Sequence, residues 1–368
     1  FYTRTKMGTL RDLNPDPRFT KSLVDGNFFN KDHLVLVDVG ARKGFEKHWD
    51  NYADQINLIG FEPNEESYKE CVEKKSNLQT SYYPFALDRK KGEKDFYITS
   101  YLSACGFYKP DEKMIKKFGS ADTFNVTEVI KVPTIDLDSF CVEYNIQNVD
   151  FIKLDTEGSE LDILKGAEKT LKSSVIGISI EVEFIKMYID QPLFSDIDQY
   201  LRSLNFELYD LDLNRKTRSS LSPYSSSNLG IGQLVQGQAL YLRDSANELE
   251  DYDLNKKFWN KTKILKMASI QELFNLPDCA IELIQKSQSL DIIKDTDANK
   301  YIDLLIPDLD GSSTSYSEYL QELRASKPRI DHFKKGKYSK IFKYFPWPLP
   351  QIFKKILLKI RDFTNLFI

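Results

Sequence analysis

The chain has 368 residues, of which 41% are hydrophobic and 13% aromatic, and its formal net charge at pH 7 is −4. A chain of this length and apolar content buries a full hydrophobic core, which excludes a disordered or fibrous protein. The four cysteines, Cys71, Cys105, Cys141 and Cys279, lie far apart without a C-x-x-C pair. The sequence therefore indicates neither a disulfide framework nor a zinc site.

The charge of the chain is unevenly distributed. Residues 331–368 carry nine Lys or Arg and two Asp, a balance of +7, which leaves −11 for the other residues. This asymmetry marks the end of the chain as a separate functional zone. No apolar core of a signal peptide follows the first residues, and with the cysteine usage this favours a reducing, cytoplasmic location.

From about residue 34, short apolar runs alternate with helical stretches. This alternation is typical of a parallel sheet covered by helices. The main strands are predicted at residues 33–40, 56–63, 81–88, 149–155, 175–184, 206–213 and 237–243. Two shorter strands are predicted at 92–100 and 132–135.

Helices are predicted between these strands. They cover residues 46–55, 65–76, 136–146, 160–174 and 194–205, and several amphipathic helices follow Asp244. In the second of them, Cys71 and Val72 are expected to face the sheet. Residues 101–130 mix aromatic and polar side chains without a stable period, which predicts an active-site loop region.

These elements predict a doubly wound α/β fold. The expected organisation is an N-terminal segment 1–33, an α/β domain 34–244, a helical extension 245–338 and a basic tail 339–368. In such a sheet the ligand binds outside the carboxyl ends of the strands, near the switch in strand order. Residues at the predicted strand ends are therefore the first candidates for a site.

The end of the first strand, "VDVGARKG", predicts a ligand-binding turn. Gly40 and Gly44 allow backbone N–H groups to approach a ligand, and Asp38 lies two residues before the first glycine. Glu62 ends the second strand, where an acidic side chain accepts hydrogen bonds from ribose hydroxyls. Together these residues indicate a site for a nucleoside cofactor.

The spacing in this turn is D-x-G-x-x-x-G, without the G-x-G-x-x-G of dinucleotide folds. It resembles the S-adenosylmethionine site of class I methyltransferases. The segments "LVDVGARKGF", "IGFEPNEESY", "PFALDRKKGEKDFYI", "VPTIDLDSF" and "VDFIKLDTEGSELDILKGA" resemble those of the FkbM-like methyltransferases in order and approximate spacing. The resemblance covers about residues 34 to 244, and the last segment is the most specific.

The resemblance implies a Rossmann-like class I sheet of seven mostly parallel strands with helices on both faces, and S-adenosylmethionine as cofactor. The turn after the first strand would hold the methionine end of the cofactor, Glu62 the ribose, and residues 86–88 the adenine. The implied cofactor-binding residues are Asp38, Gly40, Ala41, Arg42, Gly44, Phe45, Glu62, Pro63, Ala86, Leu87 and Asp88. Arg42 stands where the family usually has Asn, which tolerates a left-handed backbone better.

The stretch "DFIKLDTEGSE" brings carboxylates to the end of a buried strand. Methyl transfer to a hydroxyl requires alignment of the nucleophile and removal of its proton. Asp155, Glu157 and Glu181 are the candidate catalytic carboxylates, with Glu183 as the alternative to Glu181, and Lys153 would offset their mutual repulsion. A Mg²⁺ ion held by Asp155 and a neighbouring carboxylate is an alternative way to activate the hydroxyl.

Two other side chains near these strand ends have structural interpretations. Glu160 is expected to cap the following helix, since carboxylates are favoured at helix N-termini. His48 is expected to be structural, although its place beside the cofactor turn keeps it a minor candidate.

The last 30 residues predict a basic amphipathic helix. Apolar residues from Ile352 to Phe367 recur near helical spacing, with Lys and Arg elsewhere on the helix and Trp347 just before it. This pattern favours a helix lying at a membrane surface. The alternative is a terminal helix that packs on the protein body or on a second subunit.

The sequence thus predicts an S-adenosylmethionine-dependent O-methyltransferase for a hydroxyl of a sugar, a glycolipid or a related metabolite. The expected location is the cytoplasm, at the inner face of the membrane if the tail binds there, and no nucleic-acid partner is expected. Two alternatives remain: a nucleotide-dependent oxidoreductase, and a catalytically degenerate methyltransferase fold acting as a membrane-associated binding module. The oligomeric state stays open.

Overall fold

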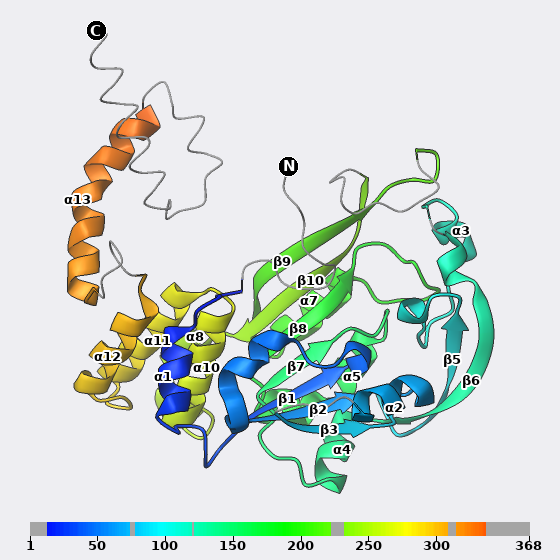
Figure 1. Cartoon of the computed structure of the whole chain (residues 1–368), viewed down its shortest axis with the longest axis horizontal. Coiled ribbons are helices and arrows are strands. Elements are labelled where there is room, and N and C mark those ends of the chain that lie inside the picture. The colour runs from blue at the N-terminus through cyan, green and yellow to red at the C-terminus, as the bar shows by residue number, and fades with distance from the viewer. Residues whose placement is uncertain (1–12, 74–77, 120, 222–231, 308–313, 336–368) are drawn as a thin grey trace. The chain divides into compact units, whose positions relative to one another are not determined.

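The computed structural model describes residues 13–73, 78–119, 121–221, 232–307 and 314–335. The chain divides into two compact units, one ending at Ile293 and one beginning at Lys294. The first contains both sheets and the candidate site (Figure 1). The second contains α12 (Asp295–Leu305) and α13 (Tyr316–Lys335). The domain boundaries expected from the sequence stay predictions.

The main sheet has seven strands in the order β3-β2-β1-β7-β8-β10-β9. Their bounds are β1 Leu34–Val39, β2 Ile56–Phe61, β3 Gln79–Tyr83, β7 Phe151–Leu154, β8 Gly177–Glu183, β9 Phe206–Lys216 and β10 Gln233–Arg243. β10 runs antiparallel to β8 and β9, and all other neighbouring strands of this sheet pair in parallel. The strand order reverses between β1 and β7, so the carboxyl ends of these two strands form the switch point where α/β sheets bind ligands.

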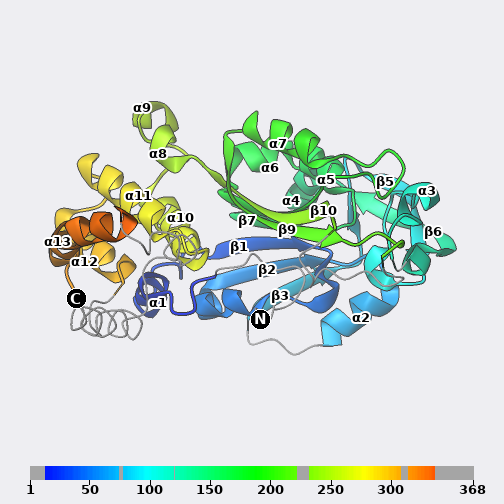
Figure 2. The same cartoon turned by 90° about the horizontal axis from the view of Figure 1, so that it is seen from above.

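Helices and turns cover both faces of this sheet. One face packs against α4 (Leu137–Glu143), α5 (Glu160–Gly166), α6 (Glu168–Ser173) and α7 (Phe194–Arg202), as Figure 2 shows. Alternate strand residues such as Val37, Ile152 and Ile180 form the core on this side. On the other face lie α2 (Glu65–Glu73) and the 3₁₀ segment Lys47–Gln55, whose Trp49 ring contacts Phe151 at 5.1 Å.

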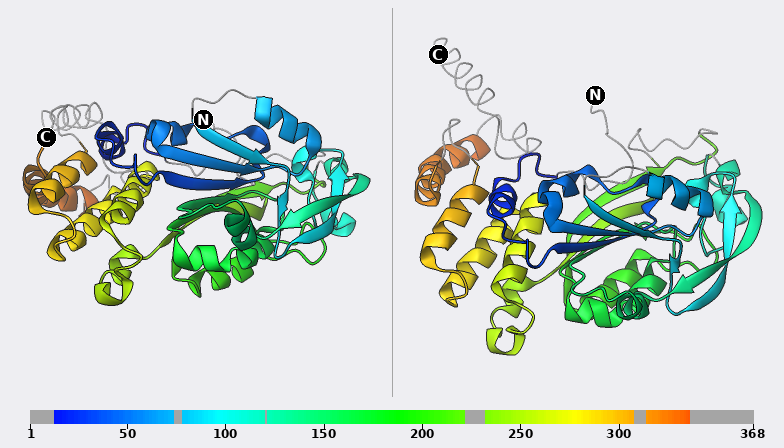
Figure 3. Two further views of the ribbon diagram at one scale, coloured as in Figure 1. Left: turned by 90° about the horizontal axis from the view of Figure 1, so that it is seen from below. Right: turned by 60° about the horizontal axis from the view of Figure 1, so that its bottom comes forward.

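A second, three-stranded sheet lies beyond the carboxyl ends of the main strands (Figure 3). Its order is β4-β6-β5, with β4 Ala86–Leu87, β5 Gly92–Thr99 and β6 Val126–Ile135. Between β5 and β6, residues 101–119 and 121–125 form a segment that we call the cap, which includes α3 (Glu112–Ile115). Pro110 of the cap bridges Tyr188, so the cap is attached to the segment that follows β8.

The remaining helices of the first unit are α1 (Arg18–Asp25), α8 (Ser245–Glu248), α9 (Tyr252–Asn255), α10 (Lys261–Leu273) and α11 (Pro277–Ser289). Helix α10 is almost entirely buried, because it lies against α1, α11 and the amino ends of the strands. Its Lys263 and Lys266 both form ion pairs with Asp150, directly before β7. Helix α10 is therefore fixed to the edge of the sheet opposite the candidate site.

The predicted fold class is confirmed, but several elements differ from prediction. Val72 does not face the sheet: it is 55% exposed, whereas Cys71 is buried. The strand expected at 81–88 is split at Pro84 into β3 and β4, which belong to different sheets. The helix expected at 160–174 is broken at Ala167 into α5 and α6. Residues 222–231 and the basic tail 339–368 lie outside the described residues.

Candidate active site

The turn after β1 is held in a left-handed conformation at Gly40, whose φ is 86°. Its N–H donates to the carbonyl of Phe61 at the end of β2. A Cβ at this position would lie 2.2 Å from the carbonyl oxygen of Asp155, so no other residue fits here. The predicted cofactor turn and the first predicted catalytic residue are thus in direct backbone contact.

Lys153 and Asp38 form a buried ion pair below this turn, with 3.1 Å between Nζ and Oδ1. Burial raises the pKa of Asp38, and the Lys153 ammonium opposes that rise. Burial lowers the pKa of Lys153, but Asp38, Asp155 and Glu46 together raise it above its usual value. Lys153 therefore stays charged and links the cofactor turn to the carboxylates beyond it.

Glu46 is a member of this group that the sequence analysis did not single out. Burial raises its pKa to about 7, with further increases from Asp38 and Asp155 and a decrease from Lys153. Its Oε2 lies 3.8 Å from Nε2 of His48. Burial, and then Lys153, lower the pKa of His48 to about 4, so this imidazole is neutral at pH 7 and forms no ion pair there. Its ring packs against Trp49 at 4.6 Å, which agrees with the predicted structural role.

Glu62 lies just beyond β2 and is only 6% exposed. Its Oε1 accepts a hydrogen bond of 2.9 Å from the N–H of Asn64, which leaves the second carboxylate oxygen available to a ligand. Burial raises the pKa of Glu62, and the charge of Arg42 lowers it. Arg42 also donates to Ser103 of the cap at 3.4 Å, so the residue that departs from the family pattern connects the cofactor turn with the cap.

Tyr82, which pairs with the predicted Phe45 beside the turn, was also missed. The ring of Tyr82 lies over Gly60, where a Cβ would come within 2.6 Å of it, and its hydroxyl faces Gly44. Phe45 lies 5.4 Å from the Tyr82 ring. Burial raises the pKa of Tyr82 to about 12. No local sequence pattern points to Tyr82, because its position depends on the pairing of β3 with β2.

The residues expected near the adenine lie in the second sheet. Ala86 and Leu87 are buried in β4, and Asp88 forms an ion pair of 3.0 Å with Lys94. Pro63 follows Glu62 and is partly buried. In the turn after β1, Ala41 is buried and Gly40 and Arg42 are partly buried. The roles of all these residues in cofactor binding stay predictions.

Asp155, Glu157 and Glu181 are brought together at the carboxyl ends of β7 and β8. Each offers one oxygen, and these oxygens lie within 4.8 Å of one another. Burial, then the charge of Asp155, raise the pKa of Glu157 to about 8. Burial and the neighbouring carboxylates also raise the pKa of Glu181. The predicted cluster therefore exists as a geometric unit, and its catalytic role stays a prediction.

The turn that carries Glu157 is tightly constrained. Glu157 has a φ of 55°, which is left-handed and uncommon for a residue with a side chain. Both oxygens of Glu160 accept backbone hydrogen bonds from this turn, from Thr156 at 2.8 Å and from Gly158 at 3.0 Å. Glu160 thus stabilises the start of α5, close to its expected capping role, while holding Glu157 in place.

Tyr188 forms the other contact that fixes Glu157. This fully buried tyrosine donates to Oε2 of Glu157 at 3.0 Å. It belongs to a small apolar cluster with Ile115 and Phe118 of the cap and with Val235 of β10. Tyr188 lies outside the helices and strands of the described residues, so no local sequence pattern indicates its role.

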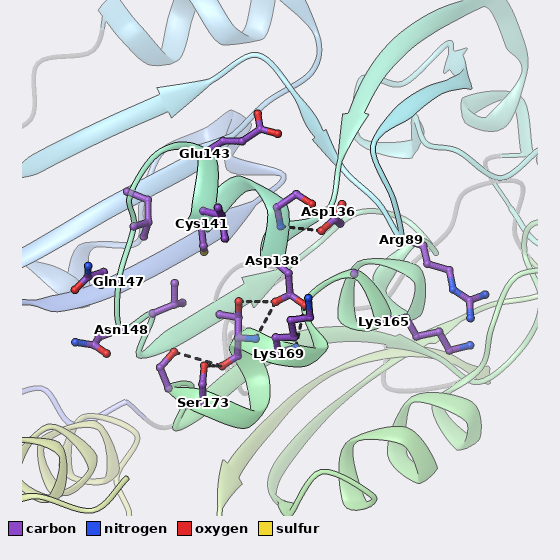
Figure 4. Close-up of a pocket in the computed structure, with 17 residues that line it drawn as sticks. Arg89, Asp136, Asp138, Cys141, Glu143, Gln147, Asn148, Lys165, Lys169 and Ser173 are labelled. Atoms are coloured by element: carbon purple, nitrogen blue, oxygen red, sulfur yellow. Dashed lines mark hydrogen bonds between the residues drawn. The ribbon is translucent and has the colours of Figure 1, made fainter. Parts of the chain in front are cut away.

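A surface cavity of about 780 Å³ lies elsewhere, between α4 and α6 (Figure 4). Asp138 lines it and accepts hydrogen bonds from the backbone N–H groups of Lys169 and Thr170, which join the two helices. None of the predicted site residues lines this cavity. It lies away from the carboxyl ends of the strands, and we assign no ligand to it.

Residues 38–208 match the family described as methyltransferase FkbM domain. No curated protein matches the chain.

The similar solved structures are distant. Magnesium protoporphyrin IX methyltransferase from Synechocystis PCC 6803, with bound SAM, is 11% identical over 65% of this chain and 87% of its own, with a TM-score of 0.28. Precorrin-6y C5,15-methyltransferase from Geobacter metallireducens GS-15 is 11% identical over 61% and 87%, with a TM-score of 0.28. The N-terminal domain of EvdMO1, in the presence of SAH and D-fucose, is 9% identical over 66% and 90%, also at 0.28. Likenesses this distant do not bear on the acceptor.

Proposed function

Because residues 38–208 are an FkbM domain of the S-adenosylmethionine-dependent methyltransferases, we propose that the chain is an O-methyltransferase for a hydroxyl of a sugar, a glycolipid or a related metabolite. The observation that carries this proposal is the contact between the Gly40 turn and Asp155. A cofactor held at that turn would present its methyl group beside the carboxylate cluster. The cluster is where a hydroxyl can lose its proton.

The proposed reaction is a single displacement. S-adenosylmethionine would supply the methyl group: the acceptor oxygen would bond to the methyl carbon as the bond from that carbon to sulfur breaks, and the electron pair of that bond would stay on sulfur. The hydroxyl proton passes to Asp155 or Glu157. A raised pKa suits Glu157 to this task, because a base with a pKa near the working pH accepts a proton efficiently.

The residues around the two ligands would have separate tasks. Asp38, Gly40 and Gly44 would shape the methionine end of the cofactor site, and Glu62 would accept hydrogen bonds from the ribose. Lys153 would position Asp38 through their ion pair.

The choice of acceptor is supported by the chemistry of the cluster and by the resemblance to FkbM-like enzymes. Carboxylates are hydrogen-bond acceptors, and the hydroxyls of a sugar are donors. Membrane contact through the tail would suit a lipid-linked acceptor.

The test is transfer of a labelled methyl group from S-adenosylmethionine to a panel of free sugars, glycolipids and lipid-linked saccharides. Asp155→Asn should bind S-adenosylhomocysteine nearly as the wild type does, but should transfer methyl about 10²–10⁴-fold more slowly. Glu112→Gln, on the surface of the cap, is the matched control. Near-normal transfer by Asp155→Asn would remove Asp155 from the reaction.

A further inference from the structure

The carboxylate cluster holds more negative charge than its neighbours balance. Asp155, Glu157 and Glu181 have oxygens within 4.8 Å of one another. Lys153 lies close by, but its ammonium is already paired with Asp38. Lys216 lowers the pKa of Glu157 from a distance, and its ammonium lies 5.1 Å from the centre of the Phe124 ring. No ion pair joins a cation to these three carboxylates among the residues that the structure describes.

A second observation is independent of this charge count. Glu183, two residues after Glu181 on β8, is 5% exposed, and its Oε2 has no hydrogen-bond partner. Residues two apart on a strand point to the same side of the sheet, so Glu183 lies on the same side as Glu181. After burial, the charge of Glu157 is the largest cause of the raised pKa of Glu183. Oε2 of Glu181 is also buried without a partner, whereas its Oε1 accepts from Gln236 at 2.7 Å. Buried polar oxygens without partners are costly, so these two oxygens are suited to bind a ligand.

We infer that Asp155, Glu157 and Glu181 bind one hard divalent cation of the Mg²⁺ and Mn²⁺ class, with the free oxygen of Glu183 beside it. All of the available ligands are carboxylate oxygens, which favour Mg²⁺, Mn²⁺ or Ca²⁺ over Zn²⁺ or copper. Opposite oxygens lie about 4.2 Å apart around Mg²⁺ and about 4.8 Å apart around Ca²⁺. Adjacent oxygens around Mg²⁺ lie about 3 Å apart, so three oxygens within 4.8 Å of one another would have to move inward to bind one ion.

The surroundings also hold the ligands in position. Tyr188 donates to Glu157, and Gln236 donates to Glu181, so each carboxylate keeps one oxygen oriented while the other is free. Such hydrogen bonds from the second layer of residues tune metal affinity, typically by about 10–100-fold.

This inference rests on the proposed function for its purpose. A cation at this point would bind the acceptor hydroxyl, and a neighbouring hydroxyl of the same sugar, and would lower the pKa of the reacting one. One of the carboxylates would still take the proton. A requirement for two adjacent oxygens would favour vicinal diols among the acceptors.

The binding test is titration of the full chain with Mn²⁺, with free Mn²⁺ measured by its electron paramagnetic resonance signal. The wild type should bind one Mn²⁺, which excess Mg²⁺ displaces. Glu181→Gln should weaken binding at least ten-fold, and Tyr188→Phe, which keeps every carboxylate, should weaken it less. Glu112→Gln, an exposed glutamate paired with Lys116, should bind as the wild type does.

The same samples are titrated with S-adenosylhomocysteine by calorimetry. If Mn²⁺ stays free in the wild type, or binds equally to Glu181→Gln, the metal site is wrong, and cofactor binding still reports on the proposed function. If Glu181→Gln does not fold, Glu157→Gln replaces it, with the same expected loss. Mn²⁺ binding without S-adenosylhomocysteine binding would support the metal site and contradict the proposed function.

Discussion

Gly40 is the residue that joins the two halves of the candidate site. We expect Gly40→Ala to lower the free energy of unfolding by more than about 1 kcal/mol, because alanine is strained at a φ of 86° and its Cβ would strike the backbone of Asp155. Binding of S-adenosylhomocysteine should be lost as well. Urea denaturation and calorimetry measure the two effects.

The control is Gly92→Ala at the start of β5, where an added Cβ meets only the hydroxyl of Thr134 at 3.9 Å. This variant should keep both its stability and its cofactor binding. Equal behaviour of the two alanine variants would show that the left-handed turn does not shape the site.

Glu46 and His48 should give opposite pH dependences of stability. The pKa of Glu46 rises from 4.5 to about 7 on folding, so the folded state holds a proton that the unfolded state has lost between these values. Glu46 therefore makes the free energy of unfolding fall as pH rises through that window. The pKa of His48 falls from 6.5 to about 4, so His48 makes the same free energy fall as pH drops through that range.

The two effects overlap from about pH 4.5 to 6.5 and largely cancel in the wild type. The free energy of unfolding of Glu46→Gln, relative to that of the wild type, should increase by about 1–3 kcal/mol as pH rises from 4.5 to 7. The free energy of unfolding of His48→Gln, relative to that of the wild type, should increase by a comparable amount as pH falls from 6.5 to 4. Chemical denaturation across this pH range in the presence of EDTA measures both. If the stability of each variant changes with pH as that of the wild type does, the pKa values of Glu46 and His48 are not shifted on folding.

The sequence predicted the site residues that end strands, and missed those placed by tertiary contacts. Asp38, Glu62 and Asp155 could be located because parallel strands deliver their carboxyl ends to one edge of the sheet. Tyr82 and Tyr188 could not, since the first depends on which strand lies beside β2 and the second lies outside every regular element. Local patterns carry no information about such distant neighbours.

At the scale of elements, Asp150 fixes α10 to the sheet. Its two oxygens accept from Lys263 at 2.6 Å and from Lys266 at 2.9 Å, and the N–H of Val35 completes the group. Asp150→Asn removes the carboxylate that pairs with the buried Lys263 and leaves Lys266 paired only with the partly exposed Asp32. We expect it to lower the free energy of unfolding by about 3–5 kcal/mol.

Asp32→Asn is the matched comparison, since Asp32 pairs with the same Lys266 but is 39% exposed. Asp32→Asn should lower the free energy of unfolding by less than about 1 kcal/mol. Thermal or urea unfolding of both variants measures the difference. Equal losses of stability in the two variants would mean that the burial of Asp150 does not increase its contribution to stability.

The wrong element predictions have identifiable physical causes. Pro84 lacks an N–H group, and the chain leaves the main sheet there, so one apolar run serves two sheets. Ala167 interrupts the helical run at 160–174 with non-helical backbone, next to Gly166, whose lack of a Cβ lets α5 approach the carbonyl of Asp88. At Ala167 a tertiary contact overrode a local helix propensity, whereas the break at Pro84 follows from the residue itself.

At the scale of the whole molecule, the basic tail differs in net charge from the acidic remainder of the chain. No helix among the described residues is both long enough and apolar enough to cross a membrane. Residues 339–368 contain six Lys or Arg and one Asp. Each basic residue near an anionic surface contributes about 1 kcal/mol, and apolar residues add insertion energy.

We therefore predict that the full chain sediments with anionic vesicles and that a chain ending at residue 338 does not. Binding should weaken as salt rises, because the charge contribution is screened within about 8 Å at physiological ionic strength. Neutral vesicles are the control. Equal sedimentation of both proteins would favour the alternative, in which this segment packs on the protein or on a second subunit.

The most direct test of the function is calorimetric titration of the full chain with S-adenosylhomocysteine and, in parallel, with NAD⁺. The wild type should bind S-adenosylhomocysteine and not NAD⁺. Glu62→Ala should weaken binding at least about ten-fold, since hydrogen bonds to a charged acceptor contribute about 1.5–3 kcal/mol. The exposed Glu66→Ala should bind as the wild type does. Binding of NAD⁺ without S-adenosylhomocysteine, or unchanged affinity in a folded Glu62→Ala, would contradict the site described here.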